Sequence, residues 1–161
     1  MCRSSILSLG QAAPLIALLD DLGIPWLAFA DGDDSGRKAL RKIGRRIGRH
    51  VDRNSDEVVM LPNDEDFEWY LVGQELQPAM TRGIANQYGD DALVVYAKSA
   101  QICADDDEAL VGFLRSSRGT YGAAVAAAIV STETETGEPV IPERIAELLR
   151  RASRILGATQ P

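Results

Sequence analysis

The sequence is poor in cysteine and histidine. Its 161 residues include two cysteines, Cys2 and Cys103, and one histidine, His50. Two cysteines without a C-x-x-C pair argue against a disulfide scaffold or a thiolate zinc site, and they favour a reduced, cytoplasmic protein. A single histidine excludes metal sites built from clustered imidazoles. The composition therefore predicts neither a thiolate nor an imidazole metal site.

Long apolar segments and phosphate-binding glycine loops are also missing. The apolar runs near the N-terminus are broken by Gly10, Gln11 and Pro14, so we expect no signal peptide, no membrane span and no membrane partner. No Gly-x-x-x-x-Gly-Lys loop is present, so no ATPase segment is predicted. The formal charge of −7 argues against a general polyanion binder. Any nucleic-acid contact must then come from a local group of cations.

The first seventy residues alternate between strand and helix patterns. Strands are predicted over residues 4–9, 24–31 and 57–62, and helices over 12–22, 37–51 and from about 63 onward. The apolar stretch over 24–31 is typical of a strand buried on both faces of a parallel sheet. The predicted buried stripe of the first helix consists of Leu15, Leu18, Leu19 and Leu22. This order predicts an α/β fold with a Rossmann-like parallel sheet.

From about residue 74 the patterns become helical. Helices are predicted over residues 78–88, 105–115, 121–130 and 142–156, with a polar loop over 131–142. The apolar run over 92–97 fits either a fourth strand or a buried helical turn. We therefore expect an α/β core over 1–73 and a helical C-terminal region over 74–161 that packs on it.

Three acidic residues, Asp31, Asp33 and Asp34, follow the predicted strand over 24–31. Ligands of open parallel sheets collect beyond the carboxyl ends of the strands, and carboxylates in a tight turn suit Mg²⁺. One alternative is an ordinary turn in which an aspartate caps the following helix. A calcium loop is a second alternative, but its twelfth position is Lys42 instead of glutamate.

A second acidic cluster follows the strand over 57–62. Its members are Asp64, Glu65, Asp66 and Glu68. Neighbouring parallel strands end at the same edge of a sheet, so this cluster is expected to approach the first. Two facing groups of carboxylates could hold a pair of cations for phosphoryl chemistry. The alternative is that these acids line a solvated first helical turn.

The helix after the first acidic turn concentrates basic residues. They are Arg37, Lys38, Arg41, Lys42, Arg45, Arg46 and Arg49. Their spacing puts them opposite the apolar stripe, where they could hold the phosphates of DNA. The alternative is a solvated outer face without a ligand.

Four segments resemble, in order and spacing, the Toprim region of OLD-family (overcoming lysogenization defect) ATP-dependent nucleases. They are GIPWLAFADGDDSG (23–36), LPNDEDFEWYL (61–71), SSRGTYGAAVAAAI (116–129) and IPERIAELLRRASRILG (141–157). The resemblance implies a DNA endonuclease that uses Mg²⁺ or Mn²⁺ at a two-metal site. It implies that Asp31 and Asp33 bind the metal, with Asp34 as a further candidate. It also implies that Glu68, or Asp66, supports a second ion.

Two departures from the family pattern affect this expectation. Arg118 stands where a lysine is expected to stabilise charge on the phosphate, and a guanidinium keeps the charge without a proton-transfer role. The family's first strand, which ends in a glutamate, has no counterpart, and residues 2–10 resemble the second strand instead. The chain is therefore expected to be a fragment, a remnant or one subunit of a larger ATPase-nuclease, with oligomers possible.

Two other functions are compatible with the sequence. A catalytically silent module that binds DNA or a protein would explain the missing glutamate. A phosphatase of the haloacid-dehalogenase type also places Asp-x-Asp after a buried strand, but Asp34-Ser35 stands where Gly-Thr is expected.

Overall fold

The computed structural model describes residues 9–62, 64–117, 122–137 and 141–158. The chain divides into two compact units, the first formed by residues 1–66 with 143–161 and the second by residues 67–142. The predicted strand over 4–9 lies outside the described residues, except for Leu9, which begins a helix. Arg118 also lies outside the described residues.

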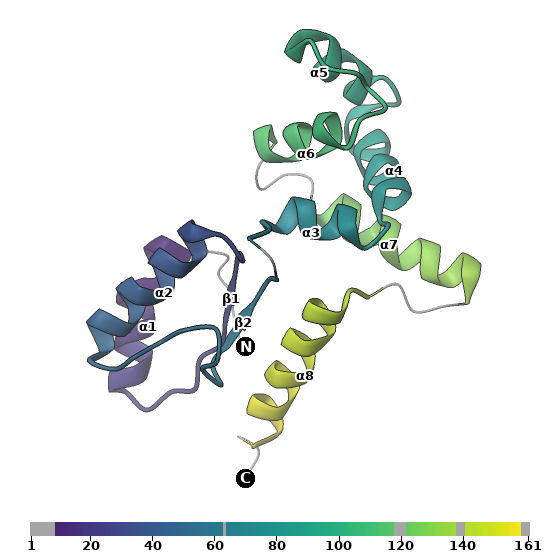
Figure 1. The fold of residues 1–161 in the computed structure, drawn as a ribbon. Helices are drawn as coiled ribbons and strands as arrows, with labels where there is room; N and C mark the ends of the chain where they lie inside the picture. The colour runs from purple at the N-terminus through teal and green to yellow at the C-terminus, as the bar shows by residue number, and fades with distance from the viewer. Residues whose placement is uncertain (1–8, 63, 118–121, 138–140, 159–161) are drawn as a thin grey trace. The chain divides into compact units, whose positions relative to one another are not determined.

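The first unit is an α/β unit, as the sequence predicts. It contains α1 (Leu9–Asp21), β1 (Ala28–Ala30), α2 (Asp34–Ile47), β2 (Val58–Met60) and α8 (Glu143–Ala158). The two strands pair in parallel, with Ala28 opposite Val58 and Ala30 opposite Met60. Figure 1 shows α1 and α2 side by side next to this sheet. The parallel pairing is therefore confirmed, but only three residues of each strand predicted over 24–31 and 57–62 are paired.

The core of the first unit lies between the sheet and these two helices. Alternate strand residues face the helices, since Ala28, Ala30, Val58 and Met60 share one buried cluster with helix residues. The helix residues of this cluster are Ala13 and Ile16 from α1 and Leu40 and Ile43 from α2. The alanines of β1 and the larger aliphatic side chains of β2 and the helices together fill this core. The sheet is thus covered by the helix that precedes β1 and the one that connects β1 to β2.

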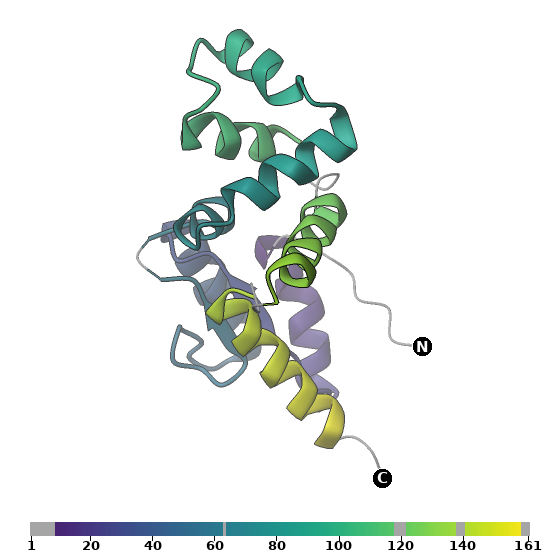
Figure 2. The same ribbon diagram turned by 90° about the vertical axis from the view of Figure 1, so that its right-hand side faces the viewer.

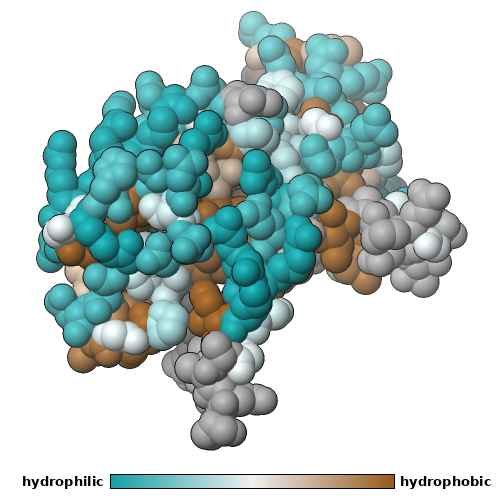
Figure 3. Space-filling model, turned by 60° about the horizontal axis from the view of Figure 1, so that its bottom comes forward, coloured by the Kyte–Doolittle hydropathy of each residue, from teal (hydrophilic) through white to brown (hydrophobic). Residues whose placement is uncertain are grey.

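The predicted buried stripe of α1 is wrong for three of its four leucines. Leu15, Leu18 and Leu22 are 42%, 54% and 63% exposed, and only Leu19 packs against the core. The helix instead buries a neighbouring stripe that contains Ala13 and Ile16. Both stripes are apolar, so helical periodicity could not decide between them. Hydrophobic side chains consequently reach the surface among hydrophilic ones (Figure 3).

The second unit is helical throughout its described residues. It consists of α3 (Phe67–Gly73), α4 (Gln77–Tyr88), α5 (Ala92–Ala100), α6 (Asp107–Ser116) and α7 (Gly122–Thr136). The ambiguous run over 92–97 is the helix α5. The loop predicted over 131–142 is wrong for its first six residues, because α7 continues to Thr136. Buried side chains of Met80, Ile84 and Leu114 form part of this unit's core.

The division into units differs from the predicted boundary after residue 73. The first unit ends at Asp66, so α3 belongs to the helical unit, and residues 143–161 return to the first unit. Short helical patterns next to a strand do not reveal which unit they join. No helix among the described residues is long and apolar enough to span a membrane.

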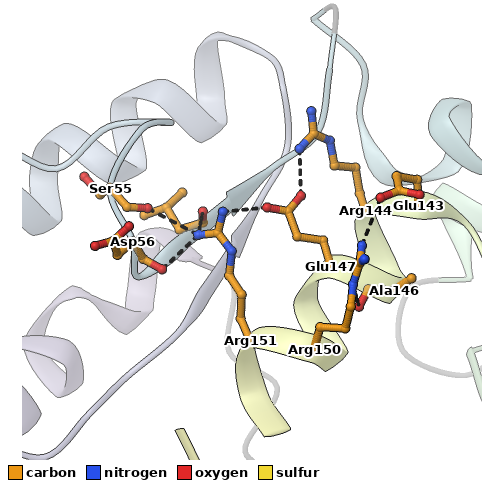
Figure 4. Close-up of polar contacts among 9 residues, drawn as sticks. Ser55, Asp56, Glu143, Arg144, Ala146, Glu147, Arg150 and Arg151 are labelled. Carbon is orange, nitrogen blue, oxygen red and sulfur yellow. Dashed lines mark hydrogen bonds and ion pairs between the residues drawn. The ribbon is translucent and has the colours of Figure 1, made fainter. Parts of the chain in front are cut away.

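The helix α8 docks on the outer edge of β2 (Figures 1 and 2). Arg151 Nη1 donates to the carbonyl oxygens of Asp56 and Val58 at 2.8 and 2.9 Å, and Nη2 pairs with Glu147 at 2.5 Å (Figure 4). Glu147 also accepts from Arg144 Nη1 at 2.7 Å, and this hydrogen bond, with Arg151, holds its carboxyl pKa below the usual range. The Val58 carbonyl points away from β1, so Arg151 satisfies a strand group that would otherwise lack a partner.

Candidate functional site

The loops that follow β1 and β2 are joined at one edge of the sheet. We call residues 31–36 the acidic turn and residues 61–62 with 64–66 the second acidic loop. The Gly32 amide donates to the carbonyl oxygen of Glu65 at 2.8 Å, and the Leu61 amide donates to the carbonyl oxygen of Ala30 at 2.9 Å. The acidic turn therefore lies beside Asp64, Glu65 and Asp66 of the second cluster, as the parallel pairing of the strands predicts, whereas Glu68 belongs to the second unit.

Two glycines make this junction possible. A Cβ on Gly32 would lie 2.6 Å from the carbonyl oxygens of both Leu61 and Pro62. A Cβ on Gly36 would lie 2.0 Å from the carbonyl oxygen of Asp31. Both contacts are with main-chain atoms, which cannot move aside as a flexible side chain can. Only glycine therefore fits these two positions of the acidic turn.

Asp33 caps the N-terminus of α2. Its Oδ1 accepts a hydrogen bond from the Gly36 amide at 2.7 Å, and its backbone is extended, with φ −81° and ψ −179°. The capping alternative considered for the acidic turn is therefore confirmed for this residue. The hydrogen bond uses one carboxylate oxygen, so capping leaves the second oxygen to other ligands.

Arg37 links the two acidic loops. Its Nη1 donates to the Gly32 carbonyl oxygen at 2.8 Å and to Asp64 Oδ1 at 2.5 Å. Its Nη2 pairs with Asp34 Oδ1 at 3.0 Å, and this hydrogen bond holds the pKa of the Asp34 carboxyl below its usual range. The sequence assigned Arg37 to DNA binding and did not predict this link. One feature of the sequence could have indicated the link: Arg37 directly follows Gly36, a buried residue of α2, so it lies beside the buried face of the helix.

The remaining predicted metal ligands have different positions. Asp31 lies on the acidic turn and Asp66 on the second acidic loop, and both are half-buried. Glu68 is buried on α3 in the second unit. Among the described residues, no three acidic, histidine or cysteine side chains gather closely enough to hold a metal ion together. A cation bound to Asp31 and Asp33 would therefore need at least one ligand besides these two side chains.

The basic residues of α2 differ from Arg49, which follows the C-cap of this helix, Gly48, although the sequence predicted one helix over 37–51. Arg49 is engaged: its Nη2 pairs with Asp20 at 3.1 Å and with Glu57 at 2.7 Å, and its guanidinium lies 5.6 Å from the centre of the Trp26 ring. Within the part of the chain that the structure describes, no ion pair is found for four exposed residues of α2. They are Lys38, Arg41, Arg45 and Arg46.

A hollow of about 420 Å³ lies beside the C-terminal half of this helix, and Arg41, Arg45 and Arg49 contribute to its lining. The surface charge is also unevenly divided. The first unit holds equal numbers of acidic and basic residues, so the net charge of −7 belongs to the second unit. The cations of α2 thus stand on a neutral unit, where a polyanion meets less long-range repulsion than the net charge indicates.

Comparison of the chain with protein-family models, with curated proteins and with solved structures finds no match.

The capping role of Asp33 predicts opposite outcomes for two substitutions. Asp33→Ala removes the acceptor for the Gly36 amide and should lower the free energy of unfolding by about 1 kcal/mol. Asp33→Asn keeps an acceptor oxygen and should stay within a few tenths of a kcal/mol of the parent, since both residues are good caps. Urea denaturation measures both values. Equal losses for the two variants would contradict the capping role.

Proposed function

We propose that this chain is the metal-binding part of a Toprim-type nuclease domain, related to that of OLD-family nucleases, and that it hydrolyses phosphodiester bonds of DNA with Mg²⁺ or Mn²⁺. The observation that carries the proposal is the junction of the two acidic loops, made by the Gly32–Glu65 hydrogen bond and the Arg37–Asp64 ion pair. It brings carboxylates to the carboxyl ends of two parallel strands, where α/β proteins bind ligands.

The donor chemistry of the acidic turn fits a hard divalent cation. Asp31 and Asp33 would supply carboxylate oxygens, and the Gly36 amide orients the Asp33 carboxylate through its other oxygen. Asp66, from the second acidic loop, is the candidate for the further ligand within the first unit. Asp34 is a weaker candidate, because Arg37 already pairs with its carboxylate. A bound cation supplies Lewis-acid polarisation of a phosphate oxygen and lowers the pKa of bound water.

The helix α2 gives the proposed site its means of holding DNA. It begins at the acidic turn, and Lys38, Arg41 and Arg45 are exposed along the helix that leads away from it. Spacings of three and four residues put these side chains on one face of the helix. A DNA backbone held along this face would extend from the carboxylates, and the cations would contact phosphates rather than bases, which sets position without sequence preference.

Two parts of the proposal come from the family resemblance alone. Arg118 would offset negative charge on the phosphate, and an ATPase domain or a separate ATPase subunit would complete the system. Catalysis by this chain also depends on the further metal ligand, since a site with fewer carboxylates binds a cation less tightly.

A catalytically silent DNA-binding module is the second candidate function. It is favoured by the finding that no three metal-binding side chains gather among the described residues. In such a module the Asp33 carboxylate would serve only as a helix cap and Asp34 and Asp64 only as partners of Arg37. The exposed cations of α2 would still bind phosphates. Metal dependence therefore separates the two functions.

Removing the charge of the acidic turn should abolish metal-dependent cleavage. Asp31→Asn and Asp33→Asn keep the size of the side chain but lose the negative charge that a divalent cation requires, so Mn²⁺-dependent nicking of plasmid DNA should fall by about 100-fold or more. Asp21→Asn, at the exposed end of α1, is the matched control and should nick like the parent. Calorimetry should show weaker Mn²⁺ binding in the first two variants only. Undiminished nicking by both would exclude the assignment.

The cations of α2 should determine the salt dependence of DNA affinity. Substituting Lys38, Arg41 and Arg45 together with glutamine removes three phosphate contacts, so the slope of log K against log salt should become shallower by about 0.9 for each contact. The matched control replaces Arg53, Arg150 and Arg154, which lie outside α2 in the same unit. Fluorescence anisotropy with a labelled duplex measures both slopes. Equal slopes for the two triple variants would show that α2 has no special part in binding.

A further inference from the structure

We infer that Arg37 is a positioning residue, which holds the second acidic loop against the acidic turn and thereby sets the spacing of the carboxylates that bind the cation. The inference rests on the proposed function and adds a role that the sequence did not indicate. Its basis is the set of three contacts that the Arg37 guanidinium makes, one with the main chain of the acidic turn and two with carboxylates.

The contacts of Arg37 require a planar guanidinium. Nη1 serves both Gly32 and Asp64, while Nε and Nη2 both donate to Asp34 Oδ1, at 3.2 and 3.0 Å. A guanidinium presents five donors in a fixed fork, whereas a lysine ammonium is a single point on a flexible stem. The link to Asp64 spans 27 residues of sequence and joins α2 to the loop after β2. Lysine at position 37 would keep the charge but could not make these contacts together.

The second acidic loop needs such a tether because its backbone adopts an unfavourable conformation. Asp64 has φ 62°, in the left-handed region that costs a residue other than glycine about 1 kcal/mol. The turn is closed by the Glu65 amide, which donates to the Pro62 carbonyl oxygen at 3.1 Å. Arg37 holds the side chain of Asp64, and the Gly32 amide holds the carbonyl group of Glu65. Both ties fix the loop that leads directly to Asp66.

Arg37 differs in this respect from the other basic residues of α2. Its side chain pairs with Asp34 and Asp64 at the start of the helix, whereas no ion pair is found for Lys38, Arg41 and Arg45 among the described residues. A phosphate contact by Arg37 would compete with two carboxylates and a carbonyl group. Arg37 therefore positions the two acidic loops and does not bind DNA phosphates.

Positioning and simple electrostatics predict opposite effects of Arg37 on a nearby cation. A positive charge beside the carboxylates repels Mn²⁺, so electrostatics alone predicts tighter Mn²⁺ binding when Arg37 is neutralised. A tether that sets the carboxylate spacing predicts weaker binding, because the ligands lose their arrangement. The sign of the change in Mn²⁺ affinity therefore distinguishes the two roles.

The test measures Mn²⁺ affinity of the full chain by calorimetry for Arg37→Gln, Arg37→Lys and Asp64→Asn. Each should weaken Mn²⁺ binding by about tenfold, as substitutions of groups that orient metal ligands do. The double variant Arg37→Gln with Asp64→Asn should lose no more than either single variant, since both break one link. Arg53→Gln removes an exposed cation elsewhere in the unit and should bind Mn²⁺ like the parent. Tighter or unchanged binding by Arg37→Gln, with Asp31→Asn weakened, would overturn the inference.

Hydrogen exchange without metal separates failure of the inference from failure of the proposed function. The Gly32 amide, which is bonded to Glu65, should exchange faster in Arg37→Gln and in Asp64→Asn than in Arg53→Gln. Unchanged exchange in both variants would overturn the tether whether or not Mn²⁺ binds. Parent protein that binds no Mn²⁺, or Asp31→Asn that binds it equally well, would remove the proposed function. Asp64→Asn alters an exposed side chain, so it reports on the tether even if Arg37→Gln does not fold.

Discussion

The structure depends on one close contact, the approach of the acidic turn to the carbonyl groups that follow β2. Gly32 lies where any side chain would collide with Leu61 and Pro62, and its amide bonds to Glu65. Parallel strands end at the same edge, but this contact is what brings the two loops to within hydrogen-bond distance. The start of α2, the position of Asp33 and the reach of Arg37 all follow from it, because α2 begins directly on the turn.

Acidic side chains that are close together at this edge repel one another, and two kinds of contact reduce this repulsion. The carboxylate of Asp33 is stabilised by the N-terminus of α2, where the helix dipole favours negative charge. Asp34 and Asp64 both form ion pairs with Arg37. Asp31 and Asp66 lie on the same two loops, so a divalent cation bound there would offset further negative charge. Among the described residues, no ion pair is found for Lys38, Arg41, Arg45 and Arg46 of α2. The difference between Arg37, which pairs with carboxylates, and these four residues is therefore the physical basis for proposing both a metal site and a DNA-binding face.

Part of this arrangement could be predicted from the sequence because it follows from periodicity and parallel pairing. The strands that contain Ala28–Ala30 and Val58–Met60, and the shared edge of the two acidic clusters, are examples. The buried face of α1 could not be predicted, since Leu15 and Leu18 are as apolar as the buried Ala13 and Ile16 on the neighbouring stripe. Nor could the sequence distinguish Arg37 and Arg49 from Lys38 and Arg45. All four are basic residues of the helix predicted over 37–51, and only the positions of Asp20, Glu57 and Asp64 in space determine which are paired.

The convergence of carboxylates on a divalent cation is the central claim, and the location of bound Mn²⁺ tests it most directly. Bound Mn²⁺ broadens the amide resonances of nearby residues, so titration followed by ¹⁵N nuclear magnetic resonance locates the ion. The account predicts saturable broadening centred on residues 31–34 and 64–66 at low Mn²⁺ concentration. It is contradicted if these resonances stay sharp while those of the acidic stretch over 105–108 broaden first. The ion would then be attracted by the negative charge of the second unit and not bound where the two loops meet.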